Sequence, residues 1–156
     1  MAIDERAALG RKMLAHATRL QEGFQFFSDW LLAAPGKIHE KLVTVQKGAD
    51  GRASAIDLPF GRVDVYYQFS RNGDEPVGQI LFVKPTDALP ARPIILKKVV
   101  IDAAGYVYFD SPENANAFEW NSQDELIPRN LIRLAYELAI EWTDAPAIDW
   151  PTPTVR

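Results

Sequence analysis

The sequence predicts an α+β fold in which two helices cover one face of a four-stranded antiparallel meander, with room for a fifth or sixth strand. Three observations lead to this expectation. A long N-terminal stretch repeats its apolar residues with a helical period, two hairpin signals follow in the middle of the chain, and a shorter amphipathic stretch lies near the end. We expect one two-layer domain over residues 1–156, of which 144–156 form an extended proline-rich tail.

The first predicted element is a helix over residues 4–33. Asp4 and Glu5 lie in its first turn, where the helix dipole favours acidic side chains, and a proline and a glycine follow its end. At about 1.5 Å per residue such a helix would run about 45 Å, whereas a compact chain of this size is only about 40 Å across. The helix therefore either breaks, with Gly23 as the natural place, or overhangs and finds a partner. Its main apolar stripe is Leu9, Met13, Ala17, Leu20, Phe24, Phe27 and Leu31, and a second row is Gly23, Phe26, Trp30 and Ala33.

Residues 37–58 support two interpretations. Ile38 and Leu42 are spaced as on one face of a helix, whereas residues 43–45 are rich in β-branched side chains and residues 49–51 are typical of a turn. We favour a short hairpin or an irregular segment here, and this is where additional strands of the sheet would lie.

The strongest hairpin signal is Asn72-Gly73, which follows a strand of strict alternation over residues 61–69. A two-residue loop at this position would set Arg71 opposite Asp74. The resulting ladder pairs Tyr66 with Gln79, Val65 with Ile80 and Val63 with Phe82. It also gives one apolar face, with Val63, Val65, Tyr67, Phe69, Ile80 and Phe82, and one mixed face, with Asp64, Tyr66, Gln68, Val77, Gln79 and Leu81.

A second hairpin is predicted at residues 102–105. Gly105 suits the left-handed position of a three-residue loop, which pairs Asp102 with Tyr106 and Val100 with Tyr108. Val99, Ile101, Val107 and Phe109 then continue the apolar face, and Lys98, Val100, Asp102, Tyr106 and Tyr108 continue the mixed one. A slip of one residue in either turn would exchange the two faces.

The last third of the chain predicts a polar turn and a helix. Ser111 caps a short segment that is rich in asparagine, and a helix follows over residues 128–142. Its apolar stripe consists of Leu131, Leu134, Leu138 and Trp142.

The mixed sheet face is the candidate functional surface. Tyrosine combines a large contact area with few rotamers and a hydroxyl for wet contacts, so a tyrosine-bearing face suits a ligand groove or a protein interface, although a solvated sheet face also tolerates tyrosine. Val77, Leu81 and Val100 on the same face favour at least partial cover. We call the following eight residues the polar sheet face: Asp64, Tyr66, Gln68, Gln79, Lys98, Asp102, Tyr106 and Tyr108.

Composition excludes several classes of site. The chain has no cysteine, and its two histidines lack the spacing of metal ligands, so we expect no metal and no cofactor. Glycine-rich phosphate loops and nucleophile elbows are absent. A net charge of −4 argues against a nucleic-acid partner. The sequence shows neither a signal peptide nor an apolar run of membrane-spanning length, so we expect a cytoplasmic protein without membrane contact.

No motif links the chain to a known family, and the function prediction rests on size, charge and the polar sheet face. We expect a non-enzymatic protein-binding module, of an inhibitor, immunity or chaperone-like kind, that associates with a protein partner or with itself. The alternative is a small-molecule-binding protein or small enzyme that uses Asp64, Lys98, Asp102 and Tyr106. Nucleic-acid binding is the third hypothesis, which the charge disfavours.

Overall fold

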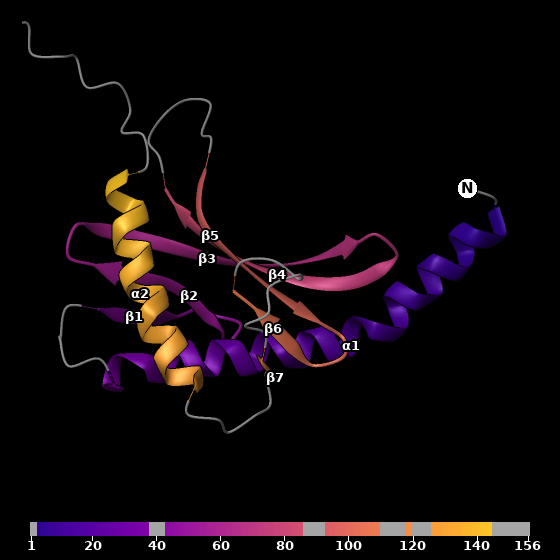
Figure 1. Ribbon diagram of the computed structural model, residues 1–156, viewed down its shortest axis with the longest axis horizontal. Helices are drawn as coiled ribbons and strands as arrows, with labels where there is room; N and C mark the ends of the chain where they lie inside the picture. Colours follow the sequence, from indigo (N-terminus) through magenta and orange to yellow (C-terminus); the bar gives the residue numbers. More distant parts are fainter. Residues whose placement is uncertain (1–2, 38–42, 86–92, 110–117, 120–125, 145–156) are drawn as a thin grey trace, which may run out of the picture.

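An antiparallel sheet with strands in simple sequence order forms one layer of the protein, and two helices form the other (Figure 1). The computed structural model describes residues 3–37, 43–85, 93–109, 118–119 and 126–144. The α+β prediction is confirmed. The elements are α1 (Ile3–Ala33), the 3-10 helix η1 (Ala34–Lys37), β1 (Thr44–Lys47), β2 (Ala53–Leu58), β3 (Gly61–Asn72), β4 (Glu75–Lys84), β5 (Ile94–Asp102), β6 (Tyr106–Tyr108), β7 (Phe118–Glu119) and α2 (Leu126–Asp144).

The sheet is larger than predicted. Its order is β1-β2-β3-β4-β5-β6-β7, so the central meander of β3 to β6 gains a hairpin before it and a two-residue strand after it. The hairpin of β1 and β2 confirms the preferred interpretation of residues 44–58, while residues 38–42 lie outside the described part of the chain. The predicted turn after Ser111 and the tail beyond Asp144 also lie largely outside it.

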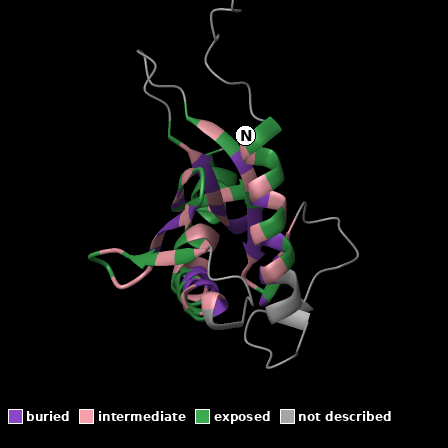
Figure 2. Ribbon diagram, turned by 90° about the vertical axis from the view of Figure 1, so that its left-hand side faces the viewer, coloured by how far each residue is buried: buried purple, intermediate pink, exposed green. Residues whose placement is uncertain are grey.

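Helix α1 is continuous through Gly23, so the first of the two alternatives, a break at this glycine, does not occur. Its buried side chains begin only at Leu20, and from there the predicted apolar stripe faces the sheet. The N-terminal half runs on past the sheet and is largely exposed or half-buried (Figures 1 and 2). The second alternative therefore holds, because the N-terminal part of this long helix extends beyond the sheet.

The register of β3 on β4 differs from the prediction by two residues. Asn72 pairs with Glu75, so the loop is Gly73-Asp74, and Gln79 lies opposite Gln68 and not opposite Tyr66. The reason is turn type. The predicted turn needs positive φ at both central residues, but only Gly73 has it (φ 61°), as in a turn that starts with glycine. Because the shift is an even number of residues, every side chain keeps its predicted face.

The second hairpin has the predicted register. Val100 pairs with Tyr108, and Gly105 takes a positive φ of 103° in the loop. The Gly105 N–H donates to the Asp102 carbonyl over 3.2 Å, which closes the turn.

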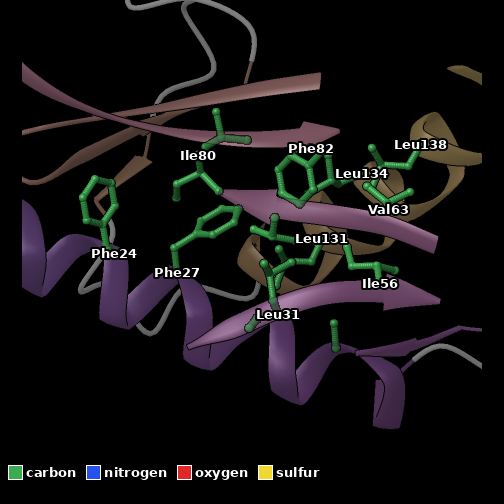
Figure 3. Packing of buried hydrophobic residues seen from close by; sticks show 14 of the residues in the cluster. Phe24, Phe27, Leu31, Ile56, Val63, Ile80, Phe82, Leu131, Leu134 and Leu138 are labelled. Atoms are coloured by element: carbon green, nitrogen blue, oxygen red, sulfur yellow. The ribbon is translucent and has the colours of Figure 1, made fainter. Parts of the chain in front are cut away.

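The core lies between the sheet and both helices (Figure 3). Phe24 and Phe27 of α1 point onto the strands, and Leu134 of α2 packs into the same cluster. Helix α1 approaches the sheet closely at Gly78 of β4, where a Cβ atom would lie 2.5 Å from Phe24 Cε1. The missing side chain of this glycine is what lets the Phe24 ring lie against the strand.

One buried polar cluster joins α1 to the sheet. Ser28 is fully buried, and its Oγ accepts a hydrogen bond of 2.7 Å from the Ala53 N–H. The Tyr67 hydroxyl donates to the Ala53 carbonyl over 2.8 Å. Burial raises the pKa of Tyr67 to about 12, which the hydrogen bond to Ser28 and the charge of Arg52 offset only in part.

The described part of the chain contains no helix with the apolar length that crossing a bilayer would require.

Candidate functional site

The polar sheet face is a grid of side chains, which the strand register defines. One row runs Gln68, Gln79, Val100, Tyr108 across four strands. The next row contains Tyr66, Leu81 and Lys98, and the row on the other side contains Ser70, Val77 and Asp102. All eight predicted residues therefore point to the side of the sheet opposite the Phe24 and Phe27 rings, because their parity along each strand is the same.

Two tyrosines carry most of the exposed aromatic area of this face. Tyr66 is 53% exposed and Tyr106 is 39% exposed. Between them, the Gln68 side-chain amide N–H donates to the side-chain oxygen Oε1 of Gln79 over 2.7 Å, which ties β3 to β4 at the surface. Asp64, beyond Tyr66 on β3, forms an ion pair of 2.9 Å with Arg62. The centre of the face is thus hydrogen-bonded within itself, and the tyrosines project on either side of it.

Asp102 organises the far end of the face. One carboxylate oxygen accepts the Tyr106 N–H over 2.9 Å, and the other accepts the Tyr108 hydroxyl over 3.0 Å. Partial burial, followed by the hydrogen bond and charge of Asp102, raises the pKa of Tyr108 above its ordinary value. Tyr108 is half-buried and its hydroxyl is held by Asp102, so Tyr106 is the more accessible of the two rings.

The four residues of the enzyme hypothesis do not converge. Asp64 pairs with Val83 and Asp102 pairs with Val77, so the two carboxylates are separated by about 20 Å along β4, at about 3.3 Å per residue. Lys98 and Asp102 are four residues apart on β5, which is about 13 Å. A small substrate could not contact this set at once, although each residue remains available to a partner with a large surface.

Small apolar side chains lie between the polar ones. Val77 and Val100 are buried on this face, and Leu81 is half-buried between Tyr66 and Lys98. Both valines are therefore shielded from solvent, in line with the partial cover that the sequence predicts for the aliphatic groups of this face. The accessible part of the face is aromatic and polar.

Sequence reasoning missed a groove at one end of the polar sheet face, between α1 and the tips of the two hairpins. Its volume is about 430 Å³, and His16, Glu75, Asp102 and Tyr108 line it. The His16 Nδ1 atom is buried and has no hydrogen-bond partner among the described residues. Lys12 bonds to Glu75 over 2.6 Å on the same helix flank and lowers the pKa of that carboxyl. No local pattern could have revealed this groove, because it joins α1 to segments that lie more than fifty residues further along the chain.

Within the described residues, no group of three or more histidine and carboxylate side chains is placed to hold a metal ion. Comparisons with protein-family models, with curated proteins and with solved structures found no match.

Proposed function

We propose that this protein is a protein-binding module and that the polar sheet face is its contact surface. The observation that carries the proposal is the pair of exposed rings, Tyr66 and Tyr106, on the strands of a hydrogen-bonded sheet. Tyrosines on rigid strands lose little conformational entropy on binding, and tyrosine is enriched at the energetic centres of protein interfaces.

The surroundings of the two rings also suit a protein partner. Gln68, two residues along β3 from Tyr66, and Lys98, across Leu81 from Tyr66, are exposed, which gives the surface donors and acceptors near the aromatic ring. This is the anatomy of a wet interface, where polar groups at the rim surround an apolar contact. The separation of the two acidic ends suits a partner that covers several strands better than it suits a small molecule.

A direct test replaces both exposed rings by alanine. The variant Tyr66→Ala with Tyr106→Ala removes the aromatic contacts, and it leaves the Tyr106 N–H bond to Asp102 intact because that bond uses the backbone. The matched control is Tyr136→Ala on α2, where the tyrosine is 50% exposed. Tyr108 is unsuitable, because its hydroxyl donates to the Asp102 carboxylate.

The partner would be trapped by a photo-crosslinking residue at position 66, then purified and titrated by calorimetry. We expect the double variant to weaken binding tenfold or more, at about 1.4 kcal/mol per factor of ten, and the control to bind as the wild type does. Equal affinity of the wild type and the double variant would refute the proposal for this face.

The groove beside His16 supports a second candidate, the binding of a small polar molecule. The observation that favours it is the unpartnered His16 Nδ1 next to Asp102 and Tyr108. Its test is an NMR screen with small polar fragments, followed on the His16 ring protons. Fragments that shift Tyr66 instead of His16 would assign the binding to the sheet face and remove this candidate.

A further inference from the structure

The N-terminal half of α1 exposes apolar side chains where the helix extends past the sheet (Figure 1). Ile3 is 85% exposed and Leu14 is 78% exposed. Between them, a Cβ atom at Gly10 would have no neighbour within 4 Å among the described residues. A helix of about 12 residues is only marginally stable in water when nothing packs on it. Packing on this flank would therefore stabilise the overhanging part of α1.

Four exposed residues of this segment follow the spacing of a coiled-coil seam. Their steps of four, three and four positions correspond to alternating d and a positions of a seven-residue repeat. Their line lies about 100° around the helix from the buried residues Leu20, Phe24 and Phe27, at about 100° per residue. We call the following residues the α1 seam: Ile3, Ala7, Gly10 and Leu14.

The sheet leaves space beside the α1 seam. The tip of the hairpin between β3 and β4 lies on the other flank of the helix, where Lys12 bonds to Glu75 over 2.6 Å. Glu5 and Asp74 line a groove on that same flank. At about 100° per residue, Glu5 and Lys12 lie nearly opposite the seam. A second helix can therefore pack on the seam without meeting this hairpin.

We propose that the α1 seam packs antiparallel against the same seam of a second copy of this chain. Ile3 of each copy then faces Leu14 of the other, around a twofold axis. Ala7 of each copy faces Gly10 of the other, and these small residues allow the two helices to approach closely. Leu20, the first buried residue of α1, lies about 9 Å past the other copy's Ile3. The sheet-covered halves of the two helices are therefore at opposite ends of the pair.

The charges beside the seam favour this orientation. Asp4 and Arg11 lie on the same side of it, and neither has an oppositely charged residue three or four positions away on its own helix. In the antiparallel pair, Asp4 of each copy faces Arg11 of the other, which gives two ion pairs, and Arg6 faces the neutral Met13. A parallel pair would instead set Arg6 against Arg11 on both sides. The charge pattern therefore fits a second copy of the chain in the antiparallel orientation.

The size of the seam determines how strong the dimer should be. The seam extends over about 17 Å of helix, at about 1.5 Å per residue. A contact of this size belongs with the small interfaces of transient complexes, which bury less than about 1,200 Å². We therefore expect a reversible dimer that forms at high protein concentration. This inference concerns α1 and does not rest on the proposed function of the polar sheet face.

The first test places a charge in the seam. Leu14→Lys buries two ammonium groups in the dimer, so it should raise the dissociation constant tenfold or more. Because Leu14 is exposed in the single chain, the fold should persist, which circular dichroism would verify. The matched control is Ile140→Lys on α2, where the isoleucine is 57% exposed, and it should leave the dimer unchanged. Sedimentation equilibrium up to about 1 mM would distinguish 17.5 kDa from twice that mass.

The second test examines the orientation by exchanging charges. Asp4→Lys and Arg11→Glu each set like charges against one another at both contacts, and each should raise the dissociation constant roughly threefold or more. An equimolar mixture of these two variants should recover the dimer, because both contacts then join opposite charges. A wild type that stays monomeric up to about 1 mM would overturn the proposal, and so would a dimer that Leu14→Lys leaves unchanged. A mixture that associates no better than its components would overturn the antiparallel pairing.

Discussion

The contact between Gly78 and Phe24 gives the sharpest test of how α1 is seated on the sheet. In Gly78→Ala the new Cβ would lie 2.5 and 2.6 Å from two atoms of the Phe24 ring and 2.8 Å from Ile101 Cγ1. All three distances are too short for carbon atoms. Because Phe24 and Ile101 are themselves buried in the core, neither can move aside freely. The helix and the sheet must therefore separate locally.

The magnitude follows from two opposing effects. Overpacking a well-packed core costs about 1–3 kcal/mol, whereas replacing glycine by alanine gains about 0.4–1 kcal/mol by restricting the unfolded chain. We expect Gly78→Ala to lower the free energy of unfolding by about 1–2 kcal/mol in urea denaturation. For a chain of this size that is a fall in melting temperature of about 2–4 °C per kcal/mol.

Two further variants decide whether the ring contact is the cause. Gly10→Ala on the exposed part of α1 has no atom within 4 Å of the new Cβ, and it should stabilise the protein by about 0.5–1 kcal/mol. Phe24→Leu should make Gly78→Ala less costly, so that the double variant is more stable than the sum of the single effects predicts. Strict additivity, or a Gly78→Ala variant as stable as Gly10→Ala, would refute the reasoning.

Three other predictions concern Ser28, Tyr67 and the contact between Gly61 and Trp142. Ser28→Ala leaves the Ala53 N–H without its acceptor and should cost about 1–3 kcal/mol in urea denaturation, whereas an unchanged midpoint would mean that another group satisfies this N–H. Tyr67 has a pKa of about 12 in the folded chain and near 10 when unfolded, so the unfolded chain loses the proton first. Its contribution is present below pH 10 and should fall by roughly 2–3 kcal/mol as the pH rises to 12. Tyr67→Phe should remove this dependence and the latest step of the tyrosinate absorbance titration. Gly61→Ala should displace Trp142, whose ring occupies the space of the new Cβ, and should shift the tryptophan emission spectrum.

The polar sheet face illustrates how far the sequence could predict a site. Its eight residues share a face because side chains alternate along a strand, and an error of two residues in the register left that parity unchanged. The exposure of each residue was not predictable in the same way. Tyr106 and Tyr108 have the same parity, yet only Tyr106 is exposed, because the Tyr108 hydroxyl is drawn to Asp102. The groove beside His16 had no signal in the sequence, because it forms only when α1 lies against the hairpin tips.

By itself the sequence determined the features that depend on a few neighbouring residues. The apolar period defined α1, the glycine at each turn located the hairpins at Gly73 and Gly105, and alternation assigned each strand residue to a face. The tertiary structure alone decided the overhang of α1 and the end of the ladder between β2 and β3 at Asp64. These features depend on contacts between distant segments, whose energies arise only when helix and sheet pack together.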